Sequence, residues 1–500
     1  MFVIAACFLT RNCYAEAEKN IVLVVVDDAS PTLGCYGDPI AKTPNLDALA
    51  KNGVRFDNAY ATTASCSASR SVILTGLHNH LNGQYGHQHH FHKFASYHNV
   101  ISLSLPFVLK RHGYRTARIG KFHVAPEKVF PFDEKLQANR RNPVLMARAC
   151  KPFIETDSEQ PFFLYFNPDD PHRSGAVDRR SNSELKPNLF GNKPNQAAHF
   201  EIEEVFYKPK RVPVPKFLPD TTETREELAQ YYQAVSRIDQ GLGELIEVLK
   251  QAGVYDKTLI VFTSDHGMAF AGAKTTVYEP GLKVPLIVRN PYESKLGTVS
   301  NSLVSHVDIT PSLVDFAEAI DKNRNGPTDW VNPNVYWQEK KEDVEDNRAG
   351  GNIFRSYQGK SWLDVLKNPA AKINEQIFAS HTFHEIQMYY PMRVIRDRRY
   401  KLIYNIAHKL EFPFASDLWE ASSWQAQYQN GPNAEYGQKT VLQYIQRQEF
   451  EFFDLENDPY ESKNLANAPG FLELLNVYKE KLRDKQDELK DPWVIKWKYE

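Results

Sequence analysis

Four short, mostly apolar segments along the chain each end abruptly in polar residues. They are residues 21–26, 115–119, 162–166 and 259–263. Continuous apolar runs of this length are typical of strands that are buried on both faces of a parallel sheet. The carboxyl ends of parallel strands meet at one edge, where open α/β sheets bind their ligands. The pattern therefore predicts an α/β fold whose polar strand exits converge on one site.

Helices are predicted between these strands. Thr43-Pro44 is typical of an N-cap followed by proline at the first helical position, and Gly53 is predicted to end that helix. Residues 223–252 form a long amphipathic pattern, and a third helix is predicted from 67 to 74. The apolar face of the long helix consists of Leu228, Tyr231, Val235, Ile238, Leu242, Leu245 and Leu249.

The pattern changes after residue 320. Residues 320–355 are polar, which predicts a long surface insertion or loop. Beyond it, residues 389–404 and 450–454 are predicted as strands, and 461–489 as a largely charged helical segment. We expect a catalytic domain over residues 18–369 and a smaller C-terminal α+β subdomain over 370–500.

The first 17 residues contain a short apolar run and a small-residue exit at Tyr14-Ala15-Glu16-Ala17. This pattern predicts a secretory signal peptide, with a buried first strand as the alternative. No other segment approaches the roughly 18 apolar residues of a membrane span. The chain is therefore expected to be exported, to the periplasm or the extracellular space in a bacterium, or to the lysosome in an animal. The absence of any Asn-x-Ser/Thr sequon favours the bacterial case.

Composition narrows the class of partner. The 42% of hydrophobic and 24% of charged residues are ordinary globular values. A net charge of −2 provides no basic surface for nucleic acid or for an anionic membrane. Outside the predicted signal peptide only Cys35, Cys66 and Cys150 remain, so no disulfide framework is predicted. Whether Cys35 and Cys150 pair is left open.

Two of the strand exits carry the ligands of a hard cation. Asp27 and Asp28 follow the first strand, and Asp265 and His266 follow the fourth. A lone Asp-Asp pair is more often a solvated loop or a helix cap. A third carboxylate at the same sheet edge favours calcium or magnesium, because adjacent carboxylates repel without compensation. His266 suits so hard an ion less well and is expected either to bind it or to orient its ligands.

The same chain carries an anion-binding pattern at Cys66-Ser67-Ala68-Ser69-Arg70. It places a sulfur at a helix N-terminus, where free N–H groups favour an anion, and a guanidinium one turn later. Cys66 is an inert buried thiol, an activated thiolate or a modified residue. The spacing is shorter than the Cys-x5-Arg loop of cysteine phosphatases, which disfavours thiolate chemistry.

Further cationic and basic side chains belong to the other exits: Lys121, His123, His172 and Lys274. A lone histidine is more often structural, and a lone lysine is usually solvated. Together with the acidic exits and Cys66 they favour a sulfate or phosphate pocket, which stabilises charge on the transferred group and protonates the leaving group.

The motif Cys66-x-Ala68-x-Arg70, followed by Leu74-Thr75-Gly76, resembles the signature of the type I sulfatases. The resemblance runs from Leu23 to Trp493. It implies an alkaline-phosphatase-like sulfatase fold, with a large mixed sheet flanked by helices and a smaller C-terminal subdomain that contains an antiparallel sheet. The late segments resemble the sulfamidase branch of that family. These segments are His384-Glu385, Tyr390-Pro391-Met392-Arg393 and Asp491-Pro492-Trp493.

The resemblance also implies roles for single residues. It implies that a formylglycine-generating enzyme oxidises Cys66 to formylglycine, and that one calcium ion is bound by that residue with Asp27, Asp28, Asp265 and His266. The residues implied around the sulfate are Arg70, Lys121, His123, His172 and Lys274. Those implied to contact the sugar are His384, Glu385 and Arg393. The chain departs from the sulfamidase pattern at His266 (asparagine there) and Lys274 (arginine there), and Ala68 replaces the commoner proline of the signature.

The implied activity is removal of N-linked sulfate from glucosamine at the end of a heparan-type glycosaminoglycan chain. A hydroxyl of the hydrated formylglycine attacks sulfur while His172 or His123 protonates the departing nitrogen, and the second hydroxyl then expels sulfate. The alternatives are an O-sulfatase on a related sugar, a phosphate or phosphonate ester hydrolase, and an inactive carbohydrate-binding relative in which Cys66 stays unmodified. The sequence allows a homodimer without indicating one.

Overall fold

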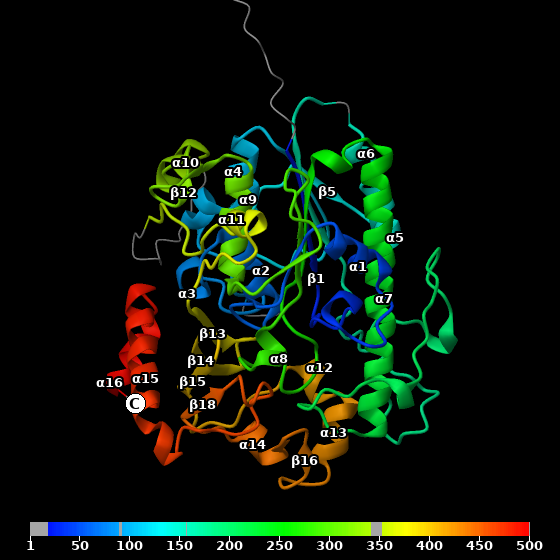
Figure 1. Ribbon diagram of the computed structural model, residues 1–500, viewed down its shortest axis with the longest axis vertical. Helices are drawn as coiled ribbons and strands as arrows, with labels where there is room; N and C mark the ends of the chain where they lie inside the picture. Colours follow the sequence, from blue (N-terminus) through cyan, green and yellow to red (C-terminus); the bar gives the residue numbers. More distant parts are fainter. Residues whose placement is uncertain (1–18, 90–92, 157, 342–352, 500) are drawn as a thin grey trace, which may run out of the picture.

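The computed structural model describes residues 19–89, 93–156, 158–341 and 353–499. An eight-stranded mixed sheet, in the order β5-β4-β6-β1-β7-β8-β2-β9, lies at its centre (Figure 1). Its four adjacent parallel strands β4, β6, β1 and β7 are the four predicted ones, so the convergence of their exits is confirmed. The strands are β1 (Asn20–Val26), β2 (Val54–Phe56), β4 (Arg115–Gly120), β5 (Glu134–Leu136), β6 (Phe162–Asn167), β7 (Thr258–Ser264), β8 (Leu286–Arg289) and β9 (Thr298–Ser300).

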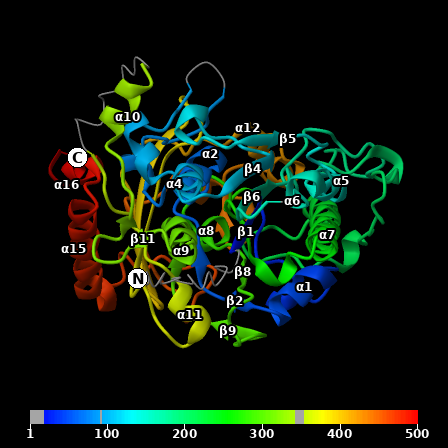
Figure 2. The ribbon, with the colours of Figure 1, turned by 90° about the horizontal axis from the view of Figure 1, so that it is seen from above.

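Both faces of this sheet are covered by helices, which explains the continuous apolar runs. In β1, Ile21, Leu23 and Val25 belong to one core, while the alternating Val22, Val24 and Val26 belong to the other. Figure 2 shows the helices on opposite sides of the strands. One layer contains α1 (Pro44–Lys51), α5 (Pro143–Ala149) and α7 (Thr222–Gln251), and the other α2 (Cys66–Thr75), α4 (Leu105–Arg111) and α9 (Ile309–Phe316).

The three predicted helices are confirmed, with one difference in how the first is capped. Thr43 is the N-cap residue of α1, but its hydroxyl accepts a hydrogen bond from Gly34 N (2.9 Å) instead of from the helix. The Asp239 carboxylate of α7 accepts from Leu46 N (2.8 Å) in the first turn of α1. A partner distant in sequence therefore satisfies the helix terminus.

The polar segment 320–355 is more structured than predicted over its described part. It contains the two-stranded ladder β11 (Ile320–Asp321) with β12 (Gly326–Pro327), followed by α10 (Pro333–Glu339). Trp337 of α10 is buried, and its indole N–H donates to His98 O (3.0 Å). Trp330 of the same segment donates in the same way to Phe354 O (3.0 Å), so aromatic side chains give this polar segment a fixed position. Residues 342–352 lie outside the described part.

A second, antiparallel sheet is built from the C-terminal residues. Its strands are β13 (Ile377–Phe383), β14 (Tyr389–Arg396), β15 (Tyr400–Asn405) and β18 (Phe450–Asp454). The predicted C-terminal helix begins later than expected, as α15 (Leu472–Glu488), and packs on this sheet through Leu475, Tyr478 and Leu482. Two short helices follow, α12 (Ser416–Trp419) and α13 (Ser422–Tyr428), and α13 packs beside the lower end of α7 (Figure 1). The predicted boundary at residue 370 stays a prediction.

No helix within the described residues is long and apolar enough to cross a membrane. The predicted signal peptide, residues 1–17, lies outside the described residues. Cys35, Cys66 and Cys150 carry free thiols.

Candidate active site

The exits of β1 and β7 bring four potential metal ligands together. Asp27, Asp28, Asp265 and His266 are completely buried, and the Asp28 N–H donates to Asp265 Oδ1 (3.0 Å). Asp28 holds this position in a left-handed backbone conformation (φ 62°), which is strained for a residue with a side chain. Such strain persists where the surroundings fix the residue, as they do at this sheet edge.

The tautomer of His266 indicates what lies between these groups. Its Nδ1 is 2.9 Å from Gly267 O, an acceptor, so Nδ1 carries the proton. Nε2 therefore presents a lone pair to Asp28 Oδ1 (3.1 Å) and to Cys66 Sγ (3.3 Å). Ligand atoms of Asp28, Cys66, Asp265 and His266 all lie within 4.8 Å of one another. Acceptors that face each other at these distances fit a cation between them.

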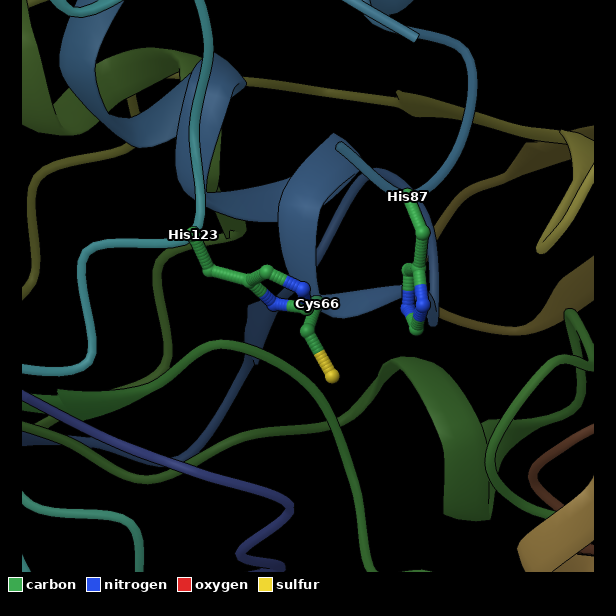
Figure 3. Close-up of side chains that lie close together, drawn as sticks. All are labelled: Cys66, His87 and His123. Atoms are coloured by element: carbon green, nitrogen blue, oxygen red, sulfur yellow. The ribbon is translucent and has the colours of Figure 1, made fainter. Parts of the chain in front are cut away.

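Cys66 is the first residue of α2, one residue before the predicted start, and its sulfur lies at the helix N-terminus as predicted. The side chain of the N-cap residue Ser65 makes no capping hydrogen bond to the first turn; its hydroxyl pairs with His384 Nδ1 (3.0 Å). The helix terminus is thus left without a side-chain cap beside the acidic cluster. Figure 3 shows the imidazoles of His123 and His87 on either side of Cys66. Ligand atoms of these three residues lie within 4.8 Å of one another.

Arg70 lies one turn further along α2 and points at the acidic cluster. Its Nε donates to Asp265 Oδ2 (3.0 Å) and its Nη2 to Asp27 Oδ1 (3.2 Å). Nη1 donates to Asn167 Oδ1 (3.2 Å). The side chain is completely buried, so the guanidinium neutralises and orients carboxylates instead of facing an incoming anion.

Two lysines supply the positive charge nearest to Cys66. Lys121 Nζ pairs with Asp27 Oδ2. Lys274 Nζ donates to Asp28 Oδ2 (3.0 Å), Asp417 Oδ2 (2.8 Å) and His172 Nε2 (3.0 Å). Since His172 Nδ1 is 2.6 Å from Arg173 O, that nitrogen carries the imidazole proton and Nε2 accepts from the lysine.

A cavity of about 450 Å³ opens over this cluster. The sequence-predicted residues on its wall are Asp27, Lys121, His123, His172, Lys274, His384 and Glu385. Cys66, Asp28, Asp265 and His266 are fully buried beside that wall. The structure does not bring Arg70 or Arg393 to the wall. Arg393 is buried away from the wall. Its Nη2 lies 3.1 Å from Asp491 Oδ1 and its Nη1 donates to the His381 carbonyl, so its donors are already used.

Comparison with known proteins shows the family to which the chain belongs. The sulfatase family model matches residues 19–319, which include the cluster from Asp27 to Lys274. The chain belongs to the sulfatase family. It is 34% identical to human N-sulphoglucosamine sulphohydrolase over 490 residues. The alignment covers 95% of this chain and 91% of that relative. It is also 27% identical to an ulvan-active sulfatase of Formosa agariphila, covering 93% of this chain and 79% of that protein.

Solved structures agree on the architecture of this sulfatase. A protein solved in complex with its substrate D-glucosamine-2-N,6-O-disulfate superposes with a TM-score of 0.61 at 20% identity, covering 95% of this chain and 99% of the other. At that identity the likeness shows the fold. The alkaline-phosphatase-like sulfatase fold, the mixed sheet and the small C-terminal antiparallel sheet predicted from the sequence are confirmed.

Burial and neighbouring charges raise the pKa values of some residues in this sulfatase site and lower those of others. Burial and the Asp27 charge raise the pKa of Asp265 to about 6. Burial also raises the pKa of Asp27, but Lys121, His172 and Arg70 outweigh it and hold that pKa well below its usual range. Burial raises the pKa of the Cys66 thiol, which leaves an unmodified Cys66 a weak nucleophile. Burial and Lys274 lower the pKa of His172 to about 4.

Several wall residues of the sulfatase cavity were missed by the sequence reasoning. They are His87, Gln88, His89, Arg140, Arg141, Asp169, Arg173, Ser416 and Asp417. In the segment that follows β6, His172 was predicted as a site residue, but Asp169 and Arg173 were not. The four histidines in Gly86-His87-Gln88-His89-His90-Phe91-His92 were a visible signal, although His90 and His92 lie outside the described residues. Asp417 carries no local signal, because only the docking of α12 brings it to Lys274.

Proposed function

We propose that this sulfatase removes N-linked sulfate from glucosamine at the end of heparan-type glycan chains. The observation that carries the proposal is the 34% identity to human N-sulphoglucosamine sulphohydrolase over 95% of the chain. That similarity extends into the C-terminal residues that build the cavity wall, among them His384, Glu385 and Asp417. A wall of cations and imidazoles suits a small, anionic sugar end.

The nucleophile of the proposed reaction is formylglycine, made from Cys66 by a formylglycine-generating enzyme. Buried carboxylates at positions 27, 28 and 265 fit one calcium ion, and His266 offers Nε2 to the same point. Formylglycine supplies a hydrated aldehyde whose hydroxyl attacks sulfur, and calcium supplies charge that favours ionisation of that hydroxyl. Arg70 keeps Asp27 and Asp265 oriented for this ion.

The chain's own side chains bind the sulfate and deliver the proton. Lys121 and Lys274 border the cavity and carry the charge that stabilises negative sulfate oxygens. His172 is oriented by the Arg173 carbonyl, and its Nε2 accepts a hydrogen bond from Lys274. It would donate to the leaving nitrogen once Nε2 has taken up a proton in place of that hydrogen bond. His123 lies on the same wall and is the alternative donor.

The test is sulfate release from N-sulfoglucosamine, with 6-O-sulfated N-acetylglucosamine alongside. The protein is produced with a formylglycine-generating enzyme, and conversion of residue 66 is measured by peptide mass. Release from the N-sulfated sugar alone is the expected result, and Cys66→Ala is the matched inactive control. Release from the O-sulfated sugar alone would replace the proposed substrate by an O-sulfated one. An unmodified thiol at residue 66 in protein from its own host would favour a carbohydrate-binding role.

We also propose that the protein is exported. Residues 1–17 would act as the signal peptide, so the mature N-terminus of secreted protein is expected near residue 18. N-terminal sequencing of protein from the medium or the periplasm decides this point. An intact Met1 on active protein would contradict it.

A further inference from the structure

The cavity holds a second group of metal-ligating side chains, apart from the carboxylate cluster. His87, His89 and Glu385 all border the cavity, and one ligand atom from each lies within 4.8 Å of the others. We propose that His87, His89 and Glu385 bind a transition-metal ion such as Zn²⁺ at the cavity wall. The proposal does not depend on which sulfated sugar is the substrate, and its three ligands are not those proposed for calcium.

The spacing of the two imidazoles fits one shared ion. His87 Nδ1 and His89 Nε2 are 3.1 Å apart. Two nitrogens bound at about 2.0–2.1 Å to a tetrahedral ion lie roughly 3.3 Å apart. A hydrogen bond between the rings would give a similar distance, but a shared ion also accounts for the third ligand at the same point, the Glu385 carboxylate, whose Oε2 accepts from Gln387 Nε2 (2.6 Å). Two nitrogens and one oxygen complete three corners of a zinc site and leave the fourth for water or an anion from the cavity.

The hydrogen bonds around His89 favour the tautomer that such a site needs. His89 Nδ1 is 2.8 Å from His123 Nε2, and the two rings are stacked at 5.0 Å. A metal-bound histidine typically donates its other N–H to a neighbour, which fixes the ring and raises its basicity. With Nδ1–H donated to His123, the lone pair of His89 Nε2 is directed at His87.

His87 is also suited to metal binding. Its imidazole is buried, and its Nε2 makes no hydrogen bond within the described part of the chain. Burial and the neighbouring His384, His123 and His89 hold its pKa well below the usual range, so the ring is neutral at physiological pH. Neutral imidazole is the form that binds zinc, copper and nickel.

The two sites select different ions through their donor atoms. The buried carboxylates of Asp27, Asp28 and Asp265 suit a hard cation, which prefers oxygen ligands. A site with two imidazoles and one carboxylate favours later transition metals instead. Both sites can therefore be filled at once when calcium is present in excess.

Occupancy of this site has a consequence for His123. With the metal on His89 Nε2, the Nδ1 proton is committed to His123, whose Nε2 is then held as an acceptor. If the proposed function holds, Zn²⁺ slows sulfate release, because the metal and His123 share the cavity wall with the sulfate. Inhibition is the secondary readout, and metal binding is the primary one.

The experiment is a calorimetric titration of the full chain with Zn²⁺ in saturating Ca²⁺, after chelator treatment. We expect one tight equivalent in the native protein and at least tenfold weaker binding in His89→Asn and in Glu385→Gln. Asparagine keeps a donor near the position of Nδ1 for His123 but has nothing in the place of Nε2, which separates folding from ligation. His112→Ala, outside the cavity and paired with Asp329, is the control and is expected to bind as the native protein does.

Cobalt substitution and Cys66 distinguish this site from its neighbour. Since Cys66, His87 and His123 form another close group, Zn²⁺ binding is also measured in Cys66→Ala and is expected to be unchanged. Loss of binding in Cys66→Ala, or a sulfur-to-cobalt charge-transfer band with Co²⁺, would assign the ion to that group and overturn the proposal. Unchanged affinity in both His89→Asn and Glu385→Gln would overturn it as well. Neither result depends on whether N-sulfoglucosamine is the substrate.

Discussion

Lys274 shows how a single side chain sets the charge at the cavity. It is almost completely buried, and its three N–H groups meet Asp28, Asp417 and His172. Burial lowers the pKa of this lysine, but the two carboxylates outweigh it and raise the pKa well above the usual range. Lys274 is therefore permanently charged and must loosen one of these contacts to bind a sulfate oxygen.

Replacing Asp417 tests how much the fixed position of Lys274 contributes, because Lys274 keeps its own charge. In Asp417→Asn the side chain keeps its shape, but Lys274 and His172 lose a charged partner. Since a hydrogen bond to a charged group contributes about 1.5–3 kcal/mol, we expect kcat/KM for the sulfated sugar to fall by roughly tenfold to hundredfold. Steady-state kinetics with Glu420→Gln, an exposed acid in the same segment, as the control measures this effect. Native kinetics in Asp417→Asn would remove Asp417 from the positioning of Lys274.

At this scale the sequence located the acids and bases but not their partners. Helical spacing predicted that Arg70 shares a face with Cys66, and it does. The spacing did not indicate that Asp265, Asp27 and Asn167 would occupy that guanidinium, because those partners come from three strand exits. Arg393 illustrates the same limit, since its ion-pair partner Asp491 is 98 residues away in sequence.

At the scale of elements, Glu227 of α7 joins three segments at one buried point. Its carboxylate accepts two hydrogen bonds from Arg173 (both 2.8 Å) and others from the Ser422 and Ser423 hydroxyls of α13 (3.0 and 2.6 Å). Burial raises the pKa of Glu227, but Arg173 outweighs it and the pKa is lowered. This network holds α13, and with it α12 and Asp417, against the catalytic sheet.

Glu227→Gln is expected to destabilise the protein and to weaken the active site. Removing one member of a buried ion pair leaves Arg173 uncompensated, which costs about 3–5 kcal/mol in the free energy of unfolding. Urea unfolding measures that loss, and kinetics below the transition measure the displaced Asp417. Glu247→Gln, an exposed acid on the same helix, is the control for surface effects. A variant as stable as the native protein would show that α13 is held by other contacts.

The contact between α7 and α1 is expected to make the stability of the protein depend on pH. Burial raises the pKa of Asp239, which accepts hydrogen bonds from the first turn of α1, to about 6. Because the folded pKa lies above the unfolded one, the native state binds more protons between pH 4 and 6. The stability contributed by this group is therefore full at low pH and is lost as the pH rises through 6.

The expected result concerns the difference between native protein and Asp239→Asn. One pKa unit corresponds to about 1.4 kcal/mol, and about one and a half units of the shift fall between pH 7.5 and 4.5, so this acidification should stabilise the native protein by about 2 kcal/mol relative to the variant. Urea unfolding of both proteins across this range measures the difference and cancels the titration of all other groups. A difference that is constant with pH would contradict a raised pKa for Asp239.

The elements themselves were predictable wherever one local signal dominated. Continuous apolar runs marked β1, β6 and β7, and the 3.6-residue period marked α7 almost to its ends. The strands β2, β8 and β9 are short, and their pairing with the parallel set depends on contacts between distant segments. The start of α15 was misplaced because the break signal at Pro469-Gly470, directly before Leu472, was not used.

At the scale of the whole molecule, the buried negative charges of the site are balanced by buried positive charges. The three buried carboxylates at positions 27, 28 and 265 are matched by Arg70, Lys121 and Lys274. A metal site without such cations would unfold when emptied, because uncompensated buried charges repel. If calcium binds here as proposed, this balance predicts that the protein folds without it and that the ion adds stability to an existing structure.

Calcium removal should therefore lower the melting temperature without unfolding the protein. A ligand that binds only the folded state adds about 2.7 kcal/mol at a concentration one hundred times its Kd, and the gain grows with the logarithm of concentration. We expect a stepwise rise in melting temperature from EGTA-treated protein to increasing Ca²⁺, with native circular dichroism throughout. Asp28→Asn should flatten that rise, whereas Glu385→Gln, which belongs to the imidazole site, should keep it. A melting temperature independent of Ca²⁺ in the native protein would remove calcium from the carboxylate cluster, and unfolding in EGTA would show that the three cations do not balance its charge.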